Sequence, residues 1–585
     1  MIKFDILFDP SSRWYYPSRI CILFFLGLAI YYQSFAFDFV FDDKMFIVNN
    51  PYIKDFKDIH LMWVSFPKTR LIGTYSFALN YFFGQLDPRG YHIFNFVIHW
   101  LTTGLVWALT RTLFKVTGWL SSDGCLREEL PFIIALLFLV HPCQTQAVTY
   151  ISQRFESMAA MFYFAAIYCY LQGRIASINK HKIFFLAAAG LLAFLGILTK
   201  ETAATIPAMV LAVELIILNK YPLNFKKFST GQLYLLITIL GLIFIFLFLK
   251  IVRLNFGMYL HYTAPSESHD GDMITSGKYV LTQMRVFLTF LRLLIFPVHQ
   301  TLDYDYPLST GLLHPPLTLV GLGLIGFIIF LIIRLRQQWP LIAFGLAWIL
   351  ITFSINTAPR INVIFEHKLY LISFGFFLAA VSALSTVIKD RRILLGVLIT
   401  FIALLSLVSY QRNHVWKNEL TLWNDIVVKS PHKARPYNYR GVAYSNNGDL
   451  DCAVSDFTRS IEIDPKLVES YNDRAGVYFK QGKLDLAIAD YNKAIEIEPT
   501  LIVPYFNRGL LYINRGDFTQ AISDFTKVVE IKPKFIPAYT MLAELYCQLK
   551  EYDKAWAYIY KIKILRGHLD PRFINMLKKF SGRDR

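Results

Sequence analysis

Long apolar segments recur along most of the chain, and they restrict its fold more than any other feature. A helix needs about 20 apolar residues to cross a bilayer. Eleven segments meet this requirement, near residues 19–37, 92–110, 131–149, 156–172, 183–199, 202–219, 233–251, 316–333, 340–356, 369–388 and 393–410. Inside a membrane the backbone must satisfy its own hydrogen bonds, so each segment is expected to be helical. The sequence therefore predicts an all-α, multi-span membrane domain over residues 1–412.

Basic residues collect in alternate turns between the apolar segments. They follow the segments that end near residues 110, 172, 219, 333 and 388, as the positive-inside rule requires if the N-terminus is cytoplasmic. Acids and bases nearly balance between residues 434 and 569, so the net charge of +17 comes from the membrane half and does not indicate nucleic-acid binding. With an odd number of spans, the C-terminal part is expected to lie outside the cytoplasm.

The N-terminal 18 residues carry basic side chains but no small-residue cleavage site, which predicts a retained signal-anchor. No Asn-X-Ser/Thr sequon occurs anywhere in the chain. Because much of the chain is expected to face outward, this absence favours the cell (inner) membrane of a bacterium over the endoplasmic reticulum.

The segment 279–297 is open to two interpretations, because it contains Arg285 and Arg292. An amphipathic or re-entrant helix on the outer face keeps both arginines on one side. The alternative, a twelfth span, would place Arg334 and Arg336 outside, against the positive-inside rule. We therefore expect the first arrangement.

A repeat of 34 residues begins at Ala434. Small residues, tyrosines, alanines and prolines recur at that spacing, as in Tyr444, Tyr478, Tyr512 and Tyr546, and this pattern is the tetratricopeptide signature. We predict repeats over residues 434–467, 468–501 and 502–535, and a degenerate fourth over 536–569, which has Lys550 where the others have glycine. A half-repeat junction (415–433) precedes them and a basic tail (570–585) follows.

Ionisable residues gather on the outer side of this predicted topology. At membrane depth each costs several kcal/mol of free energy unless it is paired or hydrated. The first are Asp42 and Asp43, directly after the first span. The others are His141, Arg154, Lys200, Glu201, Arg285, Arg292, Asp303, Asp305, Glu366 and His367. Most also have a structural interpretation: a neutralising Lys200–Glu201 pair, arginines that reach lipid headgroups, a helix cap for His141 and turn residues at 303 and 305. The cysteines show no metal-ligand spacing.

The combination of outer acids and outer bases indicates a type of chemistry. An acid can deprotonate an attacking hydroxyl, and cations beside lipid can stabilise a phosphate leaving group. This suits transfer of a sugar from a polyprenyl phosphate, with Asp42 or Asp43 as the catalytic carboxylate and Arg285, Arg292, Lys200 or Arg154 on the donor phosphate. The chain has no GxxxxGK[ST] motif, and the GxGxxG match at Gly321–Gly326 lies inside an apolar segment rather than between a strand and a helix, so a nucleotide donor is not indicated.

Several short motifs carry a family resemblance. They are Asp42-Asp43 with Asn50-Pro51, Leu86-Asp-Pro-Arg-Gly-Tyr-His92, His141-Pro142, Leu198-Thr-Lys-Glu-Thr202, Leu302-Asp-Tyr-Asp305 and Glu366-His-Lys-Leu-Tyr-Leu371, followed by the repeats. In this order they resemble the transmembrane and tetratricopeptide-repeat protein O-mannosyltransferases and their bacterial relatives, a family similar to the C-type glycosyltransferases. The resemblance covers nearly the whole chain.

The resemblance implies a lipid-phosphate sugar donor, mannose or a similar hexose, and inverting transfer to a protein Ser/Thr hydroxyl. It implies Asp42 or Asp43 as the base and the repeats as the acceptor-binding part, and it leaves a divalent cation open. Where the family has His-Arg, this chain has His367-Lys368, which removes a bidentate phosphate donor. The alternatives are a non-catalytic, membrane-anchored repeat scaffold for envelope proteins and a transporter of lipid-linked sugars.

Overall fold

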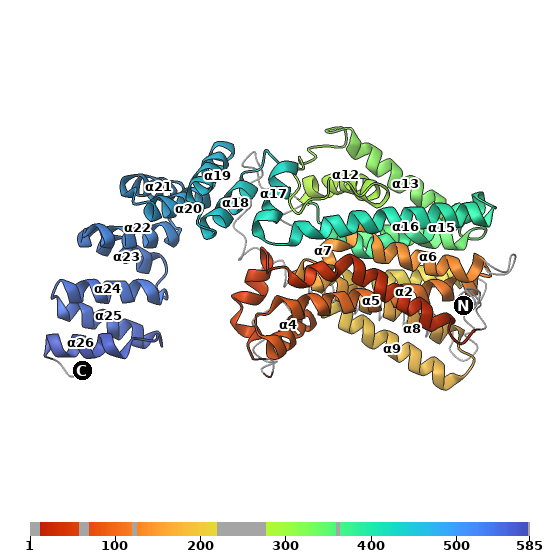
Figure 1. Ribbon diagram of the computed structural model, residues 1–585, viewed down its shortest axis with the longest axis horizontal. Helices are drawn as coiled ribbons and strands as arrows, with labels where there is room; N and C mark the ends of the chain where they lie inside the picture. Colours follow the sequence, from red (N-terminus) through yellow and green to blue (C-terminus); the bar gives the residue numbers. More distant parts are fainter. Residues whose placement is uncertain are drawn as a thin grey trace, which may run out of the picture. The chain divides into compact units, whose positions relative to one another are not determined.

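The computed structural model describes residues 12–55, 57, 70–119, 126–218, 276–358 and 363–582. Every regular element within these ranges is a helix, so the predicted all-α class is confirmed. The helices form two compact units, Met1–Asp425 and Ile426–Arg585, which are described separately (Figure 1).

The first unit holds the long apolar helices. They are α2 (Tyr15–Tyr31), α4 (Leu71–Gly84), α5 (Pro88–Thr117), α6 (Leu126–Val140), α8 (Arg154–Ile175), α9 (Asn179–Ile197), α10 (Ile206–Ala212), α12 (Ser276–Ile295), α13 (Leu317–Leu335), α14 (Pro340–Phe353), α15 (Leu369–Val387) and α16 (Arg391–Asn413). In the described ranges, seven helices are long and apolar enough to cross a membrane, or eight if the bent pair Glu128–Val140 and Pro142–Val148 is one span. A multi-pass membrane protein is therefore confirmed.

Three of the eleven predicted spans are not among these eight. The segment 233–251 lies outside the described residues. The segment 202–219 is helical but broken into short 3-10, α and π turns between Glu201 and Ile217. Helix α8 is continuous but more polar, and it is buried among its neighbours, chiefly α9 and α5. A helix shielded in this way by other helices can carry charged residues that a lipid-exposed helix could not.

Aromatic side chains and close backbone contacts hold the centre of this unit together. Phe164 of α8 stacks on Trp348 of α14, with ring centroids 5.4 Å apart and planes at 11°. Helices α14 and α15 meet at two glycines, where a Cβ added to Gly345 would lie 2.6 Å from the carbonyl oxygen of Gly375. Such small-residue contacts let membrane helices approach closely.

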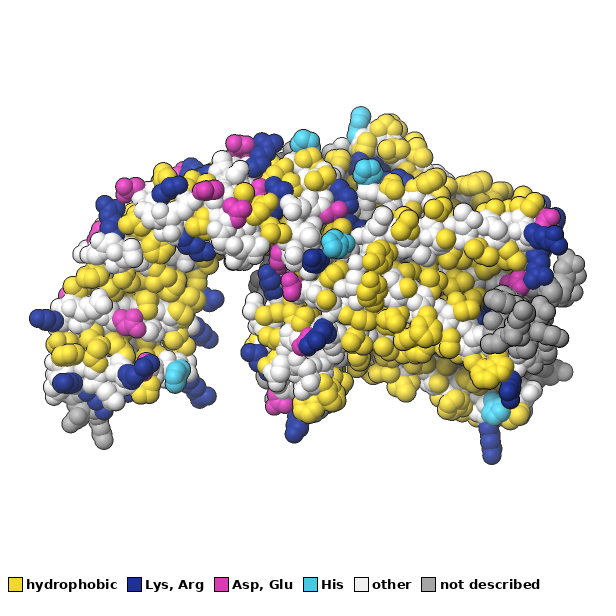
Figure 2. All heavy atoms as spheres, viewed as in Figure 1, with side chains coloured by type: hydrophobic (Ala, Val, Ile, Leu, Met, Phe, Trp, Pro, Cys, Tyr) yellow, Lys and Arg dark blue, Asp and Glu magenta, His cyan; other side chains and the backbone are white. Residues whose placement is uncertain are grey.

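The outer surfaces of α9, α13 and α16 carry large exposed apolar side chains, among them Phe184, Phe194, Phe330 and Leu407. Figure 2 shows hydrophobic side chains over the visible face of this unit, with charged side chains toward the ends of its long helices. This distribution is the one that a lipid environment selects.

Helix α12 occupies the segment that was open to two interpretations. It is strongly amphipathic and is not among the candidate spans of the described residues. Its apolar side, with Val286, Phe287 and Phe290, packs into a cluster with residues of α13, α14 and α15. These features favour the packed amphipathic helix over a twelfth span.

The second unit is a row of helix pairs. They are α18 (Ala434–Asn446) with α19 (Leu450–Ile463), α20 (Val468–Lys480) with α21 (Leu484–Ile497), α22 (Ile502–Arg515) with α23 (Phe518–Ile531), and α24 (Ile536–Gln548) with α25 (Tyr552–Ile564). Helix α17 (Glu419–Lys429) precedes them, and α26 (Pro571–Ser581), in the predicted basic tail, packs on the last pair through Leu577 and a bond from Trp556 Nε1 to Ser581 Oγ of 3.1 Å.

The turn inside each pair explains why Lys550 aligns with glycines. Gly448, Gly482 and Gly516 have φ of +86°, +75° and +82°, and Lys550 has φ of +62°. All four residues therefore adopt the left-handed conformation, which is easy for glycine and strained for lysine. The fourth repeat keeps the turn geometry of the others although it has lost their residue.

Candidate functional site

The loop after the first span holds its two adjacent acids in different environments. Asp43 is 1% exposed, and its Oδ1 and Oδ2 accept backbone N–H bonds from Ser152 at 2.7 Å and Val40 at 3.2 Å. Asp42 is half-buried, and its backbone N–H donates to the Tyr150 hydroxyl at 3.0 Å. Asp43 is thus anchored inside the protein, whereas Asp42 lies closer to the surface.

Burial changes the acidity of the anchored residue. The pKa of Asp43 is raised to about 7, chiefly by desolvation and to a smaller extent by the charge of Asp42, while the two N–H bonds act in the opposite direction. The largest effect is burial, so this carboxyl changes protonation near neutral pH.

The segment from Tyr150 to Glu156 joins this loop to a second group of charged residues. Ser152 holds Asp43, and the next residue, Gln153, accepts a hydrogen bond from Lys200 Nζ at 3.3 Å. The residue after Gln153, Arg154, begins α8. One short segment therefore bonds to both the acid pair and Lys200.

A buried triad lies next to this stretch. Glu156 Oε2 is 3.0 Å from Lys200 Nζ and 3.4 Å from Lys368 Nζ, and the three side chains are 1%, 4% and 2% exposed. Burial lowers the pKa of Lys200, and the charge of Arg70 acts in the same direction, whereas Glu156 and Glu201 raise it. Two cations share one carboxylate, so the triad carries a net positive charge when all three groups are ionised.

The guanidinium of Arg154 is hydrogen-bonded to neutral groups of the protein. It donates to Asn95 Oδ1 at 2.6 Å, to Asn80 Oδ1 at 2.6 Å and to the Tyr91 carbonyl at 2.9 Å. These partners tie α4, α5 and α8 together at one end (Figure 1). The predicted phosphate contact of Arg154 stays a prediction, and this bonding favours a structural role.

A second polar group surrounds Glu366, another of the predicted site residues. Its carboxylate accepts bonds from the Thr301 N–H at 2.7 Å, from Gln300 Nε2 at 3.2 Å and from the Tyr304 hydroxyl. His367, which directly follows Glu366, is buried, and so is Asp303, two residues after Thr301. Asp305 is exposed. Since Glu366 and Lys368 belong to one short helical turn, Glu366–Lys368, this turn connects the two groups.

The remaining cations and His141 differ in exposure. Arg285 is 5% exposed, lies over the Tyr306 ring at 4.6 Å and donates to the Pro307 carbonyl, whereas Arg292 is exposed. His141 accepts the Cys143 N–H at Nδ1 (3.2 Å) and therefore donates from Nε2 to the Leu294 carbonyl (3.2 Å). It caps the short helix Pro142–Gln144, which is the structural interpretation of this residue.

Arg70, Glu156 and Lys368 are not among the candidate site residues predicted from the sequence, and the sequence did not place Glu419 beside the loop that carries Asp42 and Asp43. Lys368 was visible in the family motif, but as a departure from it. For Glu156, the signal was a lone carboxylate in the first turn of a helix expected to span the membrane, which demands a partner. Nothing local marks Glu419 or Arg70.

The described part of the chain contains no group of three or more His, Cys, Asp and Glu side chains that could hold a metal ion. Asp42 and Asp43 supply two carboxylates, and both oxygens of Asp43 already accept backbone N–H bonds. These residues do not by themselves make a divalent-cation site.

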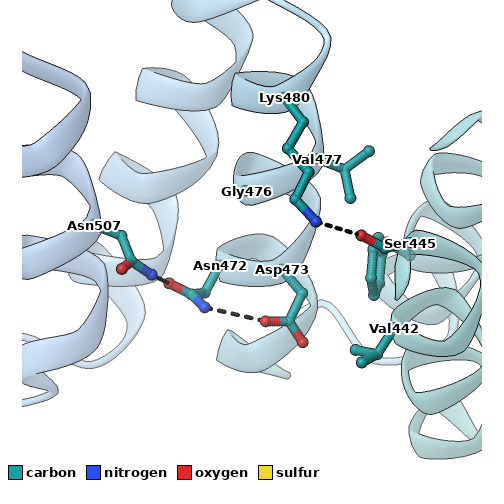
Figure 3. A pocket seen from close by; sticks show the side chains of 9 residues that line it. Val442, Ser445, Asn472, Asp473, Gly476, Val477, Lys480 and Asn507 are labelled. Atoms are coloured by element: carbon teal, nitrogen blue, oxygen red, sulfur yellow. Dashed lines mark hydrogen bonds between the residues drawn. The ribbon is translucent and has the colours of Figure 1, made fainter. Parts of the chain in front are cut away.

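The second unit has a cavity of about 190 Å³ between its first three helix pairs (Figure 3). It is lined by Val442, Ser445, Phe457, Asn472, Asp473, Gly476, Val477, Lys480 and Asn507. Its polar groups bond to each other: Lys480 Nζ to Ser445 Oγ (3.0 Å), Asn472 Nδ2 to Asp473 Oδ1 (3.1 Å) and Asn507 Nδ2 to Asn472 Oδ1 (3.1 Å). The cavity therefore combines an apolar wall with amide, hydroxyl and charged groups.

Comparisons with known proteins agree with both units. Sequence models of the tetratricopeptide repeat match residues 434–467 and 503–535, and a further model described as a TPR repeat matches 475–516. A protein O-mannosyl-transferase of Caenorhabditis elegans is 26% identical over 472 residues, which cover 76% of this chain and 63% of that protein. The chain is similar in sequence to the protein O-mannosyl-transferases.

Other O-mannosyl-transferase relatives match over different lengths. Human TMTC3 is 23% identical over 75% of this chain and 50% of its own length. Xenopus laevis tmtc2 is 29% identical over 36% of this chain and 27% of its own length. The chain thus spans less than two thirds of the curated relatives that it matches, and their activity is carried over to it only as a proposal.

Proposed function

We propose that this chain is a membrane glycosyltransferase. It moves a sugar, mannose or a similar hexose, from a polyprenyl phosphate to a protein Ser/Thr hydroxyl on the outer face of a bacterial cell membrane. The observation that carries the proposal is that one segment, residues 150–156, bonds both to the acid pair, through Tyr150 and Ser152, and to Lys200 of the buried Lys200–Glu156–Lys368 triad, through Gln153. A base and a positively charged group side by side are what this transfer needs.

In the proposed reaction, the acceptor oxygen attacks the anomeric carbon of the sugar as the bond from that carbon to the phosphate oxygen breaks. Asp42 takes the hydroxyl proton, and the lipid phosphate leaves with the bonding electrons. Attack opposite the leaving group inverts the anomeric carbon. Asp42 is favoured over Asp43 as base because it is the more accessible of the two, whereas both oxygens of Asp43 are occupied by backbone N–H groups.

The donor phosphate is proposed to bind at Lys200 and Lys368. In the structure both ammonium groups bond to Glu156, and a phosphate oxygen can replace part of that interaction. Arg70 adds positive charge near Lys200. Arg285 and Arg292 stay candidates for binding the donor phosphate.

The proposed activity is tested with membranes that contain the chain, labelled polyprenyl-phosphate mannose and a soluble extract of exported proteins. The expected product is labelled protein from which β-elimination releases the sugar, as for a Ser/Thr linkage. Membranes without the chain are the control. If no polyprenyl-phosphate hexose labels protein while exported proteins still bind the chain, the non-catalytic scaffold takes the place of the transferase.

The pH dependence of transfer is expected to follow Asp43. Protonation of this carboxyl weakens its bonds to Ser152 and Val40, so activity should fall as the pH is lowered through about 7. The measurement is initial rate from pH 5.5 to 8.5 at saturating donor, roughly the range over which such a group titrates. In Asp43→Asn, which has no titratable group there, this acidic limb should disappear. An unchanged limb in that variant would assign it to another group.

The cavity of the second unit is the proposed contact site for the acceptor polypeptide. Replacing both Asn472 and Asn507 with Ala removes the amides that line it. Because each lost hydrogen bond is worth about 1 kcal/mol, the KM for acceptor should rise about fivefold or more, with the KM for donor unchanged. Asn514→Ala, on the same helix α22 but exposed and outside the cavity, is the matched control. Equal effects of the two sets on acceptor KM would contradict the assignment.

A further inference from the structure

The backbone just before the acid pair is strained. Phe41 has φ of +46°, a conformation that residues with a Cβ rarely adopt and that surrounding contacts must enforce. It lies immediately before Asp42, so its conformation sets the direction in which both acids leave the chain.

Two residues beyond the last span enforce this conformation. The Phe41 N–H donates to Glu419 Oε1 at 3.0 Å, and the Phe41 ring meets the Trp423 ring edge-on, with centroids 5.2 Å apart and planes at 88°. Glu419 and Trp423 are one helical turn apart on α17, and Trp423 Nε1 donates to Glu419 Oε2 at 2.7 Å. The carboxylate and the ring that hold Phe41 are therefore fixed to each other.

Glu419 also holds the loop on the other side of the acids. Its Oε1 lies 2.7 Å from Lys44 Nζ. Phe41 and Lys44 flank the acid pair in sequence, so a single carboxylate fastens the loop immediately before and immediately after it. Both oxygens of Glu419 are engaged in these bonds.

We infer that Glu419 is a positioning residue for the catalytic acids. It does not touch the reacting atoms: it fixes the strained turn at Phe41, and so it orients Asp42 toward the acceptor hydroxyl and keeps Asp43 in its buried site. This inference rests on the proposed transfer reaction, and it adds a residue that lies far from the acids in sequence to the machinery of that reaction.

The kinetic test compares Glu419→Ala with Glu419→Gln. The Ala variant loses all three contacts, and its kcat should fall about 10- to 100-fold, as for other residues that orient a catalytic group, with the donor KM within about twofold of wild type. The Gln variant keeps an oxygen for the Phe41 N–H and should recover most of the lost kcat. Its acidic limb should also stay near the wild-type position, whereas that of the Ala variant should move to lower pH as Asp43 becomes hydrated.

Glu129→Ala is the matched control. Glu129 is also a helix carboxylate of the first unit in an ion pair of 2.7 Å, with Arg391, and its side chain is 14% exposed against 21% for Glu419. It should leave kcat and the pH profile unchanged. The inference is wrong if Glu419→Ala keeps kcat within about twofold of wild type, or if Glu129→Ala lowers kcat to the same extent.

Hydrogen exchange gives a readout that does not depend on activity. The Phe41 amide is protected in the structure by its bond to Glu419, and in Glu419→Ala it should exchange at least about tenfold faster, with the amides of α5 unchanged. We call the contacts of Glu419 with Phe41 and Lys44 the clamp. If wild type transfers no sugar, the proposed reaction fails, but this exchange result still tests the clamp. If transfer occurs and the Phe41 amide exchanges equally in both proteins, the clamp is wrong and the reaction stands.

Discussion

Asp42→Asn is expected to lower the rate of sugar transfer about 100- to 10,000-fold, the range that a positioned general base contributes. Asn has nearly the same shape but cannot accept the hydroxyl proton. The backbone bond from residue 42 to Tyr150 does not involve the side chain, so the loop should keep its conformation. The measurement is kcat with labelled polyprenyl-phosphate mannose, together with donor binding, which should be unchanged.

Two carboxylates of the same loop serve as comparisons. Asp38→Asn changes an exposed acid whose backbone N–H bonds to the Lys417 carbonyl, and it should keep the wild-type rate. Asp43→Asn should lose less than Asp42→Asn, about tenfold, because Asn can still accept the Ser152 N–H. If Asp43→Asn is the inactive variant and Asp42→Asn is active, the roles of the two acids are reversed.

Glu156→Gln is expected to destabilise the membrane unit by about 3–5 kcal/mol, the usual result of leaving a buried charge without its partner. Here two ammonium groups lose the same carboxylate, because Lys200 and Lys368 both bond to Glu156 Oε2. The measurement is the midpoint of thermal unfolding in detergent. Glu214→Gln is a milder comparison, since the Arg174–Glu214 pair is more exposed, at 10% and 19%.

Replacing the whole triad separates stability from function. With Glu156→Leu, Lys200→Met and Lys368→Met together, no charge is left unpaired, and the unfolding midpoint should return to near the wild-type value. Donor binding and transfer should nevertheless be lost, because the proposed phosphate site is gone. A triple variant that transfers sugar at the wild-type rate would show that the triad is structural only.

The sequence predicted those parts of the fold that depend on local patterns. Span length and apolar content are local, and eight of the eleven predicted segments are long, apolar helices or the bent pair in the described residues. The repeats were also predictable, because each repeat has a turn residue at the same position. Gly448, Gly482, Gly516 and Lys550 all adopt the left-handed conformation there. Helix α8 was harder to predict from the sequence. Its polar end is tolerated because other helices bury it.

The site was predicted in part, for a physical reason. Asp42, Asp43 and Lys200 stand in recognisable motifs, and in the structure Asp43 and Lys200 bond to adjacent residues, Ser152 and Gln153. What the sequence could not supply is which polar group bonds to which. Arg154 fits a phosphate site by charge alone, but three neutral acceptors from distant helices already surround it.

The clamp on the acid loop also has a consequence for biosynthesis. Asp42 is among the first residues to be inserted, whereas Glu419 and Trp423 follow the last span. At about 5–20 residues per second of translation, roughly 20–80 s separate the two. During that time, Phe41 has neither the carboxylate nor the ring that holds its strained backbone. In the nascent chain, Asp42 and Asp43 are therefore present long before Glu419 can orient them. The loop that carries them reaches its final conformation only when the membrane unit is complete.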